Sequence, residues 1–425
     1  MQLVNCVLLV ALLLLITYTI WTSHRHTNIV SKSEEKIARL SSTPATDENN
    51  PWIVLVVDNF QWLQQHHFHN RSVLNWIILI VATDRYLHVP LSMILPPRVL
   101  FLDWQTQQNL PYNIVPYIPE GHQARKMIGY LYAMHHGANL IYDGGGDVLL
   151  MDPRKVFLST NNINFQYVFS VTRQQHNYNK AVIVNPYNFF FGKRVKMWPR
   201  GTPLLSLNRN QLINMTQREP ALPLIQHVIV ENEFDLDIIC RKAFLRKNLD
   251  SPPIEKFDEA ICVPPTLFAP FNSRSTLFDW TVFSTLYMPI HVTPSSASDV
   301  WRSYMAQRLL TDLGISYARL CFVAVAKEKT LSLKEQGRKS TPETNNEDIF
   351  DQENSMHLQL GKLIRFLDIW ESEEDNIADR MSDLVDDLIE KRLLQRHERI
   401  VYEAWALDML SISRRRQLME TTRVL

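Results

Sequence analysis

The sequence predicts an α/β fold in the middle of the chain, with an apolar segment before it and a helical module after it. Short runs rich in β-branched and apolar residues indicate the strands of a sheet. Segments whose apolar residues recur at helical spacing indicate the helices. The chain has 425 residues, of which 46% are hydrophobic, so it is a folded protein long enough for two or three domains.

The N-terminal segment is typical of a membrane anchor. Residues 3–23 carry no charged side chain, and about 20 apolar residues span a bilayer. A cleaved signal peptide is the alternative, but the apolar stretch is long and lacks a small-residue cleavage site. We therefore expect an uncleaved signal-anchor at 1–23 and a polar stem at 24–50. The positive-inside rule gives no support for a cytoplasmic N-terminus, because residues 1–23 contain no Lys or Arg.

Four apolar runs in the central part of the chain each end at an aspartate. They are IVLVVD (53–58), WIILIVATD (76–84), VLFLD (99–103) and LIYD (140–143). Ligands of open parallel sheets bind at the carboxyl ends of the strands. Four acids at strand ends therefore indicate a binding site along that edge, although a helix N-cap or a turn is the commoner role of any single strand-end aspartate.

One stretch, QARKMIGYLYAMHHGANLIYDGGGD (123–147), combines several of these signals. Its apolar residues recur at helical spacing and Gly137 stands where a helix ends. A short apolar run follows and leads to Asp143 and Asp147. Carboxylates in such a place usually hold a sugar, a ribose or a hard cation. The stretch therefore predicts a nucleotide-sugar site.

The rest of the chain divides into three parts. Residues up to 330 mix strand-like runs with a helix expected to begin at Ser298, which completes a domain at 51–330. Residues 331–355 are charged and poor in apolar residues, as in a linker. Residues 356–425 show helical periodicity throughout and form the expected C-terminal module.

Composition excludes several classes of function. Lys+Arg and Asp+Glu both number 44, so no global field attracts nucleic acid. The 4 cysteines show no CxxC spacing, which argues against a structural zinc site or a redox motif. Cys240 and Cys262 either pair in an oxidising compartment or remain buried free thiols. The histidines His66, His67 and His69 lack the spacing of a metal motif.

Five strings occur in order that are more specific than composition. They are RKMIGYLYAMHHGANLIYD, NPYNFFFGKRVKMWPRGTPL, ENEFDLDIICR, FAPFNSRSTLFDWTVF and SDVWRSYMAQRLLTDLG. Together they resemble the STELLO-like family of Golgi membrane proteins, whose plant members are glycosyltransferase-like proteins of cellulose synthase assembly. The resemblance covers about residues 52–330. It implies a GT-A-like nucleotide-sugar-binding fold, a single N-terminal anchor and a Golgi membrane location of type II, with the C-terminal part lumenal.

The chain departs from the family pattern at the acidic motif. An Asp-x-Asp-Asp-Asp pattern is replaced here by Asp143-Gly-Gly-Gly-Asp147. In GT-A-like enzymes this motif holds a divalent cation, typically Mn²⁺, that stabilises the leaving nucleoside diphosphate. Three alternatives stay open: the two remaining carboxylates bind one ion, they bind it too loosely, or glycine N–H groups contact phosphate directly.

The resemblance also implies roles for individual residues. For donor binding the expected residues are Asp84, Arg125, Lys126, Asp143, Asp147, Arg302 and Arg308, with Asp143 and Asp147 as the metal ligands. A catalytic base at Asp235 or Asp237 and an acceptor pocket of Trp198, Arg200 and Asn272 complete the set. Surface or structural roles are the alternatives, including an Asp299–Arg302 salt bridge within one helix. Asn70 and Asn214 begin Asn-x-Ser/Thr triplets and are the candidate glycosylation sites.

Two functions from different classes follow. The leading hypothesis is a Golgi glycosyltransferase that transfers a sugar from a nucleotide-sugar donor. The rival is a catalytically inactive, transferase-like scaffold that organises other Golgi glycosyltransferases, which the loss of acidic residues favours. A coiled-coil adaptor built on the C-terminal helices ranks last, because the heptad signal there is short and interrupted.

Overall fold

The computed structural model of the chain describes residues 51–57, 76–89, 95–145, 166–171, 182–191, 197–207, 213–219, 221–230, 235–237, 239–240, 254–255, 259–311, 319–325 and 346–424. The expected anchor and stem, together with Asn70 and Asp147, lie outside these ranges. None of the helices inside them is long and apolar enough to cross a membrane.

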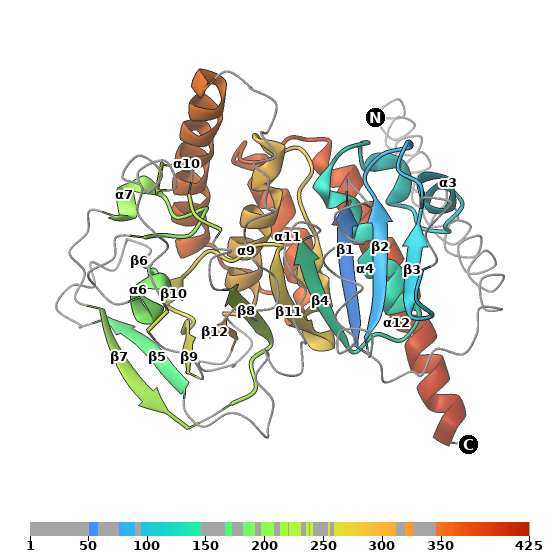
Figure 1. The fold of residues 1–425 in the computed structure, drawn as a ribbon, viewed down its shortest axis with the longest axis horizontal. Coiled ribbons are helices and arrows are strands. Elements are labelled where there is room, and N and C mark those ends of the chain that lie inside the picture. The colour runs from blue at the N-terminus through green and yellow to red at the C-terminus, as the bar shows by residue number, and fades with distance from the viewer. Residues whose placement is uncertain are drawn as a thin grey trace, which may run out of the picture.

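A mixed sheet forms the centre of the molecule (Figure 1). In the described residues it has ten strands in the order β3-β2-β1-β4-β11-β8-β12-β9-β5-β7. Their bounds are β1 Trp52–Val57, β2 Ile77–Ala82, β3 Val99–Leu102, β4 Leu140–Gly145, β5 Gln166–Val171, β7 Ile213–Arg218, β8 Ile225–Val230, β9 Ala260–Cys262, β11 Ser275–Asp279 and β12 Leu320–Val325. A second, small sheet pairs β6 (Val182–Ile183) with β10 (Leu267–Phe268).

The four runs predicted as strands are β1 to β4, and they pair in parallel. β2 is buried along its whole length, which explains its continuous apolar sequence. β11 then runs antiparallel to β4 on one side and to β8 on the other. The result is a mixed α/β architecture with a large central sheet, compatible with a GT-A-like domain.

Helices pack around the sheet (Figure 1). Their bounds are α3 Trp104–Gln108, α4 Lys126–His135, α6 Tyr187–Phe190, α7 Leu204–Leu207, α9 Ser298–Leu309, α10 Asn346–Ile369, α11 Ile377–Glu390 and α12 Glu398–Val424, with 3-10 turns η2 Val115–Tyr117, η3 Gln123–Arg125, η5 Trp280–Leu286 and η6 Ser295–Ala297. The predicted helix start at Ser298 is confirmed. α9 is buried almost all round rather than on one apolar side, so its polar residues need partners inside the protein.

α4 and its exit explain why the sequence uses two glycines there. Gly137 follows the helix with a φ of 80°, the left-handed conformation that ends helices. Gly129 lies against the sheet: a Cβ at that position would come within 2.6 Å of Val54 and 2.8 Å of Val81. The glycine therefore lets the helix lie close to β1 and β2.

The C-terminal helices share the core of the sheet. One hydrophobic cluster joins buried residues of β1, β2, α4 and α9 with Leu384, Trp405 and other residues of α10 to α12. Two buried acids of α12 add polar contacts: Glu398 accepts hydrogen bonds from the backbone N–H groups of Ile290 and His291 (2.9 and 3.0 Å), and Asp408 accepts from Asn113. α10 begins at Asn346, inside the segment 331–355 that the composition indicates as a linker.

The cysteines pair differently from the sequence-based hypothesis. Cys262 on β9 forms a disulfide with Cys321 on the neighbouring strand β12. Cys240 is a buried free thiol. The suggested Cys240–Cys262 bridge is therefore wrong. It was inferred from proximity in the sequence, whereas the pairing of β9 with β12 brings the sulfur atoms of Cys262 and Cys321 together.

Candidate functional site

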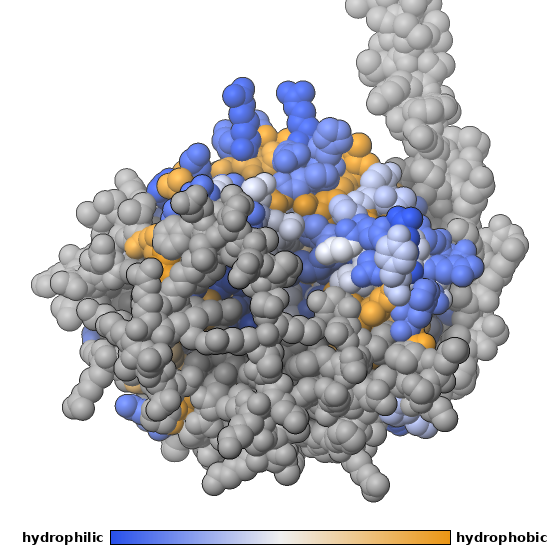
Figure 2. Space-filling model, turned by 45° about the horizontal axis from the view of Figure 1, so that its top comes forward, coloured by the Kyte–Doolittle hydropathy of each residue, from blue (hydrophilic) through white to orange (hydrophobic). Residues whose placement is uncertain are grey.

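The carboxyl ends of β1 to β4 lie at one edge of the sheet, and the residues that follow β4 meet the loop that enters β11. Ser275, the first residue of β11, pairs with Gly144. The preceding residues Asn272 to Arg274 therefore lie next to the end of β4. Figure 2 turns this edge forward and shows a recess with hydrophilic residues near the middle of the face.

Asp143, two residues before the end of β4, lies between two cations. Its Oδ1 lies 2.7 Å from Lys126 Nζ and its Oδ2 lies 2.7 Å from Arg302 Nη2. The carboxylate is fully buried. Burial raises its pKa, but Lys126 and Arg302 together outweigh burial and lower the pKa below its usual range. Asp143 is therefore an internal counter-ion that remains charged.

Lys126 and Arg302 both donate further hydrogen bonds to residues close to Asp143. Lys126 Nζ also donates to the carbonyl oxygens of Gly144 (2.7 Å) and Ser273 (2.5 Å). Arg302 donates to Ser273 Oγ (2.8 Å) and to the hydroxyl of Tyr130 (3.1 Å). These bonds fasten the end of β4 to the loop before β11.

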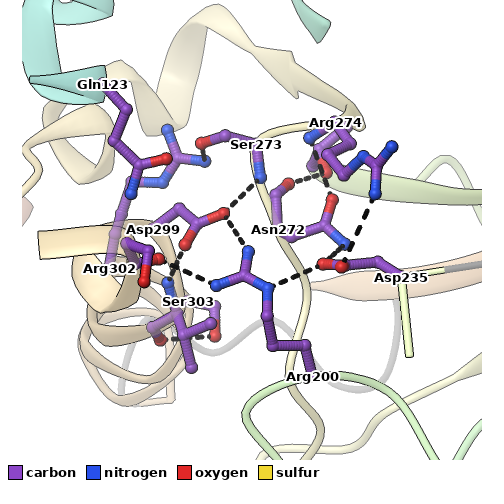
Figure 3. Close-up of polar contacts among 12 residues, drawn as sticks. Gln123, Arg200, Asp235, Asn272, Ser273, Arg274, Asp299, Arg302 and Ser303 are labelled. Carbon is purple, nitrogen blue, oxygen red and sulfur yellow. Dashed lines mark hydrogen bonds and ion pairs between the residues drawn. The ribbon is translucent and has the colours of Figure 1, made fainter. Parts of the chain in front are cut away.

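A second set of charges continues from this loop (Figure 3). Arg200 joins two carboxylates, with Nε 3.0 Å from Asp235 Oδ2 and Nη2 2.7 Å from Asp299 Oδ2. Asn272 donates to Asp235 (2.8 Å), and the Ser273 N–H donates to Asp299 (3.1 Å). Burial lowers the pKa of Arg200, but the two carboxylates outweigh it and raise the pKa above its usual value.

Arg274 is the cation of this set whose side chain is most exposed, at 26%. Its Nη1 lies 3.7 Å from Asp235 Oδ1. Sequence reasoning did not single out this residue, although it directly follows Asn272 and Ser273 in a family-matching string. With Arg274 included, the described residues joined by these ion pairs are the cations Lys126, Arg200, Arg274 and Arg302 and the carboxylates Asp143, Asp235 and Asp299. We call these seven residues the four-cation cluster. The four-cation cluster therefore carries one net positive charge, which suits an anion.

A histidine missed by the sequence analysis lies beneath these charges. His227 on β8 contacts Thr276 Oγ1 through Nδ1 (2.8 Å), and Thr276 donates to the Asn272 carbonyl (2.6 Å). Burial lowers the pKa of His227 to about 4, although the nearby carboxylates raise it. His227 is therefore neutral at physiological pH and supports the loop rather than adding charge.

A divalent cation does not fit at Asp143. Both oxygens of Asp143 already accept from cationic groups. Within the described ranges no three His, Cys, Asp or Glu side chains are grouped to hold a metal ion. The other expected ligand, Asp147, lies outside those ranges.

Three expected donor residues have other partners. Asp84 accepts from the backbone N–H groups of Tyr86 and Leu87 (2.7 and 3.0 Å), as a turn former does. Arg125 is fully buried and stacks on the Trp104 ring at 4.0 Å; burial lowers its pKa to about 10. Arg308 donates to the carbonyl of Trp370, next to α10. None of these contacts involves a residue of the four-cation cluster.

The two acids proposed as a catalytic base contact different parts of the protein. Asp235 joins the charged edge, whereas Asp237 lies 2.9 Å from His357 of α10 and accepts from the Ile239 N–H. Both are buried. Alternation along a strand places them on one side, but their contacts belong to different parts of the site.

The string Trp198 to Gly201 explains the position of Arg200. Gly201 has a φ of 87°, and a Cβ there would lie 2.3 Å from Val300 at the start of α9. This close approach brings Arg200 to Asp299 on the same helix. Trp198 is half-buried, and its carbonyl oxygen accepts from the Asp237 N–H at 3.4 Å. The predicted Asp299–Arg302 pair is not the pairing found, since each binds a residue of another element.

The candidate glycosylation acceptor Asn214 is exposed. It lies on β7, the last strand at one edge of the sheet, and pairs with Ser170 of β5. Thr216, the third residue of the triplet, is exposed as well.

A large mixed sheet with helices packed around it places the chain among α/β proteins and is compatible with a GT-A-like domain. Two curated plant proteins from Arabidopsis thaliana, "Probable glycosyltransferase STELLO1" and "Probable glycosyltransferase STELLO2", are each 30% identical to it over 320 and 325 residues, or 74% of this chain. These relatives confirm the resemblance to the STELLO-like family. The chain spans 39% of the length of each of them. No family model matches it.

Proposed function

We propose that the chain is a glycosyltransferase-like protein that binds a nucleotide-sugar donor at the carboxyl edge of β1 to β4 and transfers the sugar to an acceptor. The observation that carries the proposal is the net positive charge of the four-cation cluster at this edge, because a nucleoside diphosphate is an anion. The names of the relatives support the reaction class.

Within this proposal the residues have distinct tasks. Arg274, which reaches solvent, contacts a phosphate oxygen of the donor. Asp235 is the carboxylate that receives the proton of the acceptor hydroxyl, and Arg200 and Asn272 hold it in place. A donor and an acceptor then meet beside the loop that contains Asn272 and Arg274.

Nucleotide binding tests the proposal directly. The purified full chain is titrated with UDP and GDP while its Tm is followed, because a ligand of the native state raises the apparent stability. We expect one nucleotide to raise the Tm, and Arg274→Ala to abolish the rise. Arg399→Ala is the matched control, since Arg399 is more exposed, at 43%, and pairs with Asp386 and Glu403 of the C-terminal helices. An unchanged response in Arg274→Ala contradicts the assignment.

A scaffold without catalysis is the second candidate, and one observation favours it. Asp143, the first residue of the acidic motif, is occupied by Lys126 and Arg302. A scaffold binds other Golgi glycosyltransferases without a nucleotide. Absence of a Tm shift with any nucleotide, together with co-purification of such an enzyme from Golgi membranes with wild type and Arg274→Ala alike, supports this candidate.

We further propose a Golgi membrane protein of type II whose described part is lumenal. The Cys262–Cys321 disulfide supports an oxidising compartment, because such bonds are rare in the cytosol. The exposed Asn214 triplet is available for a glycan there. Protease protection of the chain in intact microsomes, and a mobility shift on glycosidase treatment that Asn214→Gln reduces, would test this topology.

A further inference from the structure

The ammonium group of Lys126 is surrounded by oxygen atoms of the kinds that surround a bound metal ion. It lies 2.7 Å from Asp143 Oδ1, 2.7 Å from the Gly144 carbonyl oxygen and 2.5 Å from the Ser273 carbonyl oxygen. One carboxylate and two carbonyl oxygens are the donor types that hard cations take. An ammonium group has three N–H donors, so all of them are used here.

The position of this group matters as much as its ligands. Two of the three oxygens come from consecutive residues at the end of β4, where the acidic motif begins. The third comes from the loop before β11, which also carries Arg274. The side chain of Lys126 is 5% exposed and that of Arg302 is fully buried. Neither cation is a surface group that a dissolved metal ion could readily displace.

Arg302 closes the remaining side of the carboxylate. Its Nη2 lies 2.7 Å from Asp143 Oδ2, so a metal ion approaching Asp143 would meet two positive charges at short range. The three oxygens around Lys126 become available only if the ammonium group is removed.

We propose that the ammonium group of Lys126 is a built-in cation that takes the place of a divalent metal ion, so that a nucleoside diphosphate binds at this edge without one. The part concerning the nucleotide rests on the proposed function, whereas the part concerning cation binding at Asp143 does not. Lys126 has no N–H left for phosphate and contributes its charge. Arg274 makes the direct contact.

Removing the ammonium group tests the first part. Lys126→Ala frees Asp143 Oδ1 and two carbonyl oxygens and leaves a space, whereas Lys126→Met removes the charge but fills the space. We expect Mn²⁺ to bind Lys126→Ala, seen as loss of the free Mn²⁺ signal in EPR and as a rise in Tm. Wild type and Lys126→Met should show neither. Adding Asp143→Asn to Lys126→Ala should abolish the binding.

A binding measurement on the wild-type chain tests the proposal without depending on the folding of any variant. UDP or GDP affinity is measured by calorimetry in EDTA and in Mn²⁺, and we expect a ratio near one. A tenfold or greater loss of affinity in EDTA overturns the proposal, as does stoichiometric Mn²⁺ binding by wild type that Asp143→Asn removes. Absence of nucleotide binding under both conditions contradicts the proposed function instead, and the Mn²⁺ response of Lys126→Ala then still decides the cation inference.

Discussion

Asp143→Asn is the substitution whose effect on stability follows most directly from the structure. It leaves the size of the side chain unchanged but removes the charge between Lys126 Nζ and Arg302 Nη2, both 2.7 Å away. At an effective dielectric constant of about 20, unit charges about 3 Å apart attract by about 5–6 kcal/mol. The desolvation of three buried charges offsets much of this attraction in the folded protein.

The net loss is larger than for a surface pair because the two cations stay buried without a counter-ion. Breaking a buried pair by removing one partner costs about 3–5 kcal/mol. We expect Asp143→Asn to lower the free energy of unfolding by this amount in urea denaturation of the purified chain. Asp103→Asn is the matched control, because Asp103 caps α3 at its N-terminus and asparagine caps equally well.

A double-mutant cycle separates the ion pair from other effects. Asp143→Asn combined with Lys126→Met should destabilise by about 0.5–3 kcal/mol less than the sum of the single changes, since the second change removes a cation already unpaired. Strict additivity, or a loss below about 1 kcal/mol for Asp143→Asn, would refute the reasoning. Because the folded pKa of Asp143 is lowered, its contribution is present above about pH 4 and is lost as the pH falls through the folded pKa.

Three further predictions concern the stability of the fold. Replacing both cysteines of the disulfide, which are 59 residues apart, with alanine should lower the free energy of unfolding by about 4 kcal/mol, whereas Cys240→Ala leaves the bond intact and should cost less in the same urea titration. Gly129→Ala should destabilise by about 1–3 kcal/mol because its Cβ overlaps two valines; Gly361→Ala on α10 meets open space and should stabilise by up to about 1 kcal/mol, and a gain at both positions would contradict this. Burial raises the pKa of Asp408 to about 7, although hydrogen bonds from three N–H groups lower it. The contribution of Asp408 to the free energy of unfolding is therefore present below about pH 4 and is lost as the pH rises through about 7. Urea denaturation at several pH values should show this loss of stability in wild type and not in Asp408→Asn.

Local patterns in the sequence predicted the parts of the fold that depend on neighbours in the chain. The four apolar runs became β1 to β4, and the helix start at Ser298 and the stop at Gly137 are found where the sequence puts them. Each of these features follows from residue spacing, capping or backbone conformation within a few positions. These local preferences agree with the folded structure because burial of the same apolar residues favours the same helices and strands.

Partners across the sheet could not be predicted in the same way. Asp299 and Arg302 lie on one helix at a spacing that allows a bridge, yet they pair with Arg200 and Asp143 from other elements. The bridge to Cys321 and the contact of Asp237 with His357 also join distant segments. These pairings depend on which strands become neighbours, and one sequence does not record that order.

The hydrophobic cluster shared by the first strands and the last helices sets the order in which the chain can fold during its synthesis. β1 and β2 leave the ribosome before α12, but the hydrophobic cluster to which they belong also includes Trp405 and other residues of α10 to α12. Until α12 is complete, part of this cluster stays exposed and is open to chaperones. A truncation before α12 should therefore remove more than one helix: it should prevent the sheet from reaching its native state and mark the product for quality control.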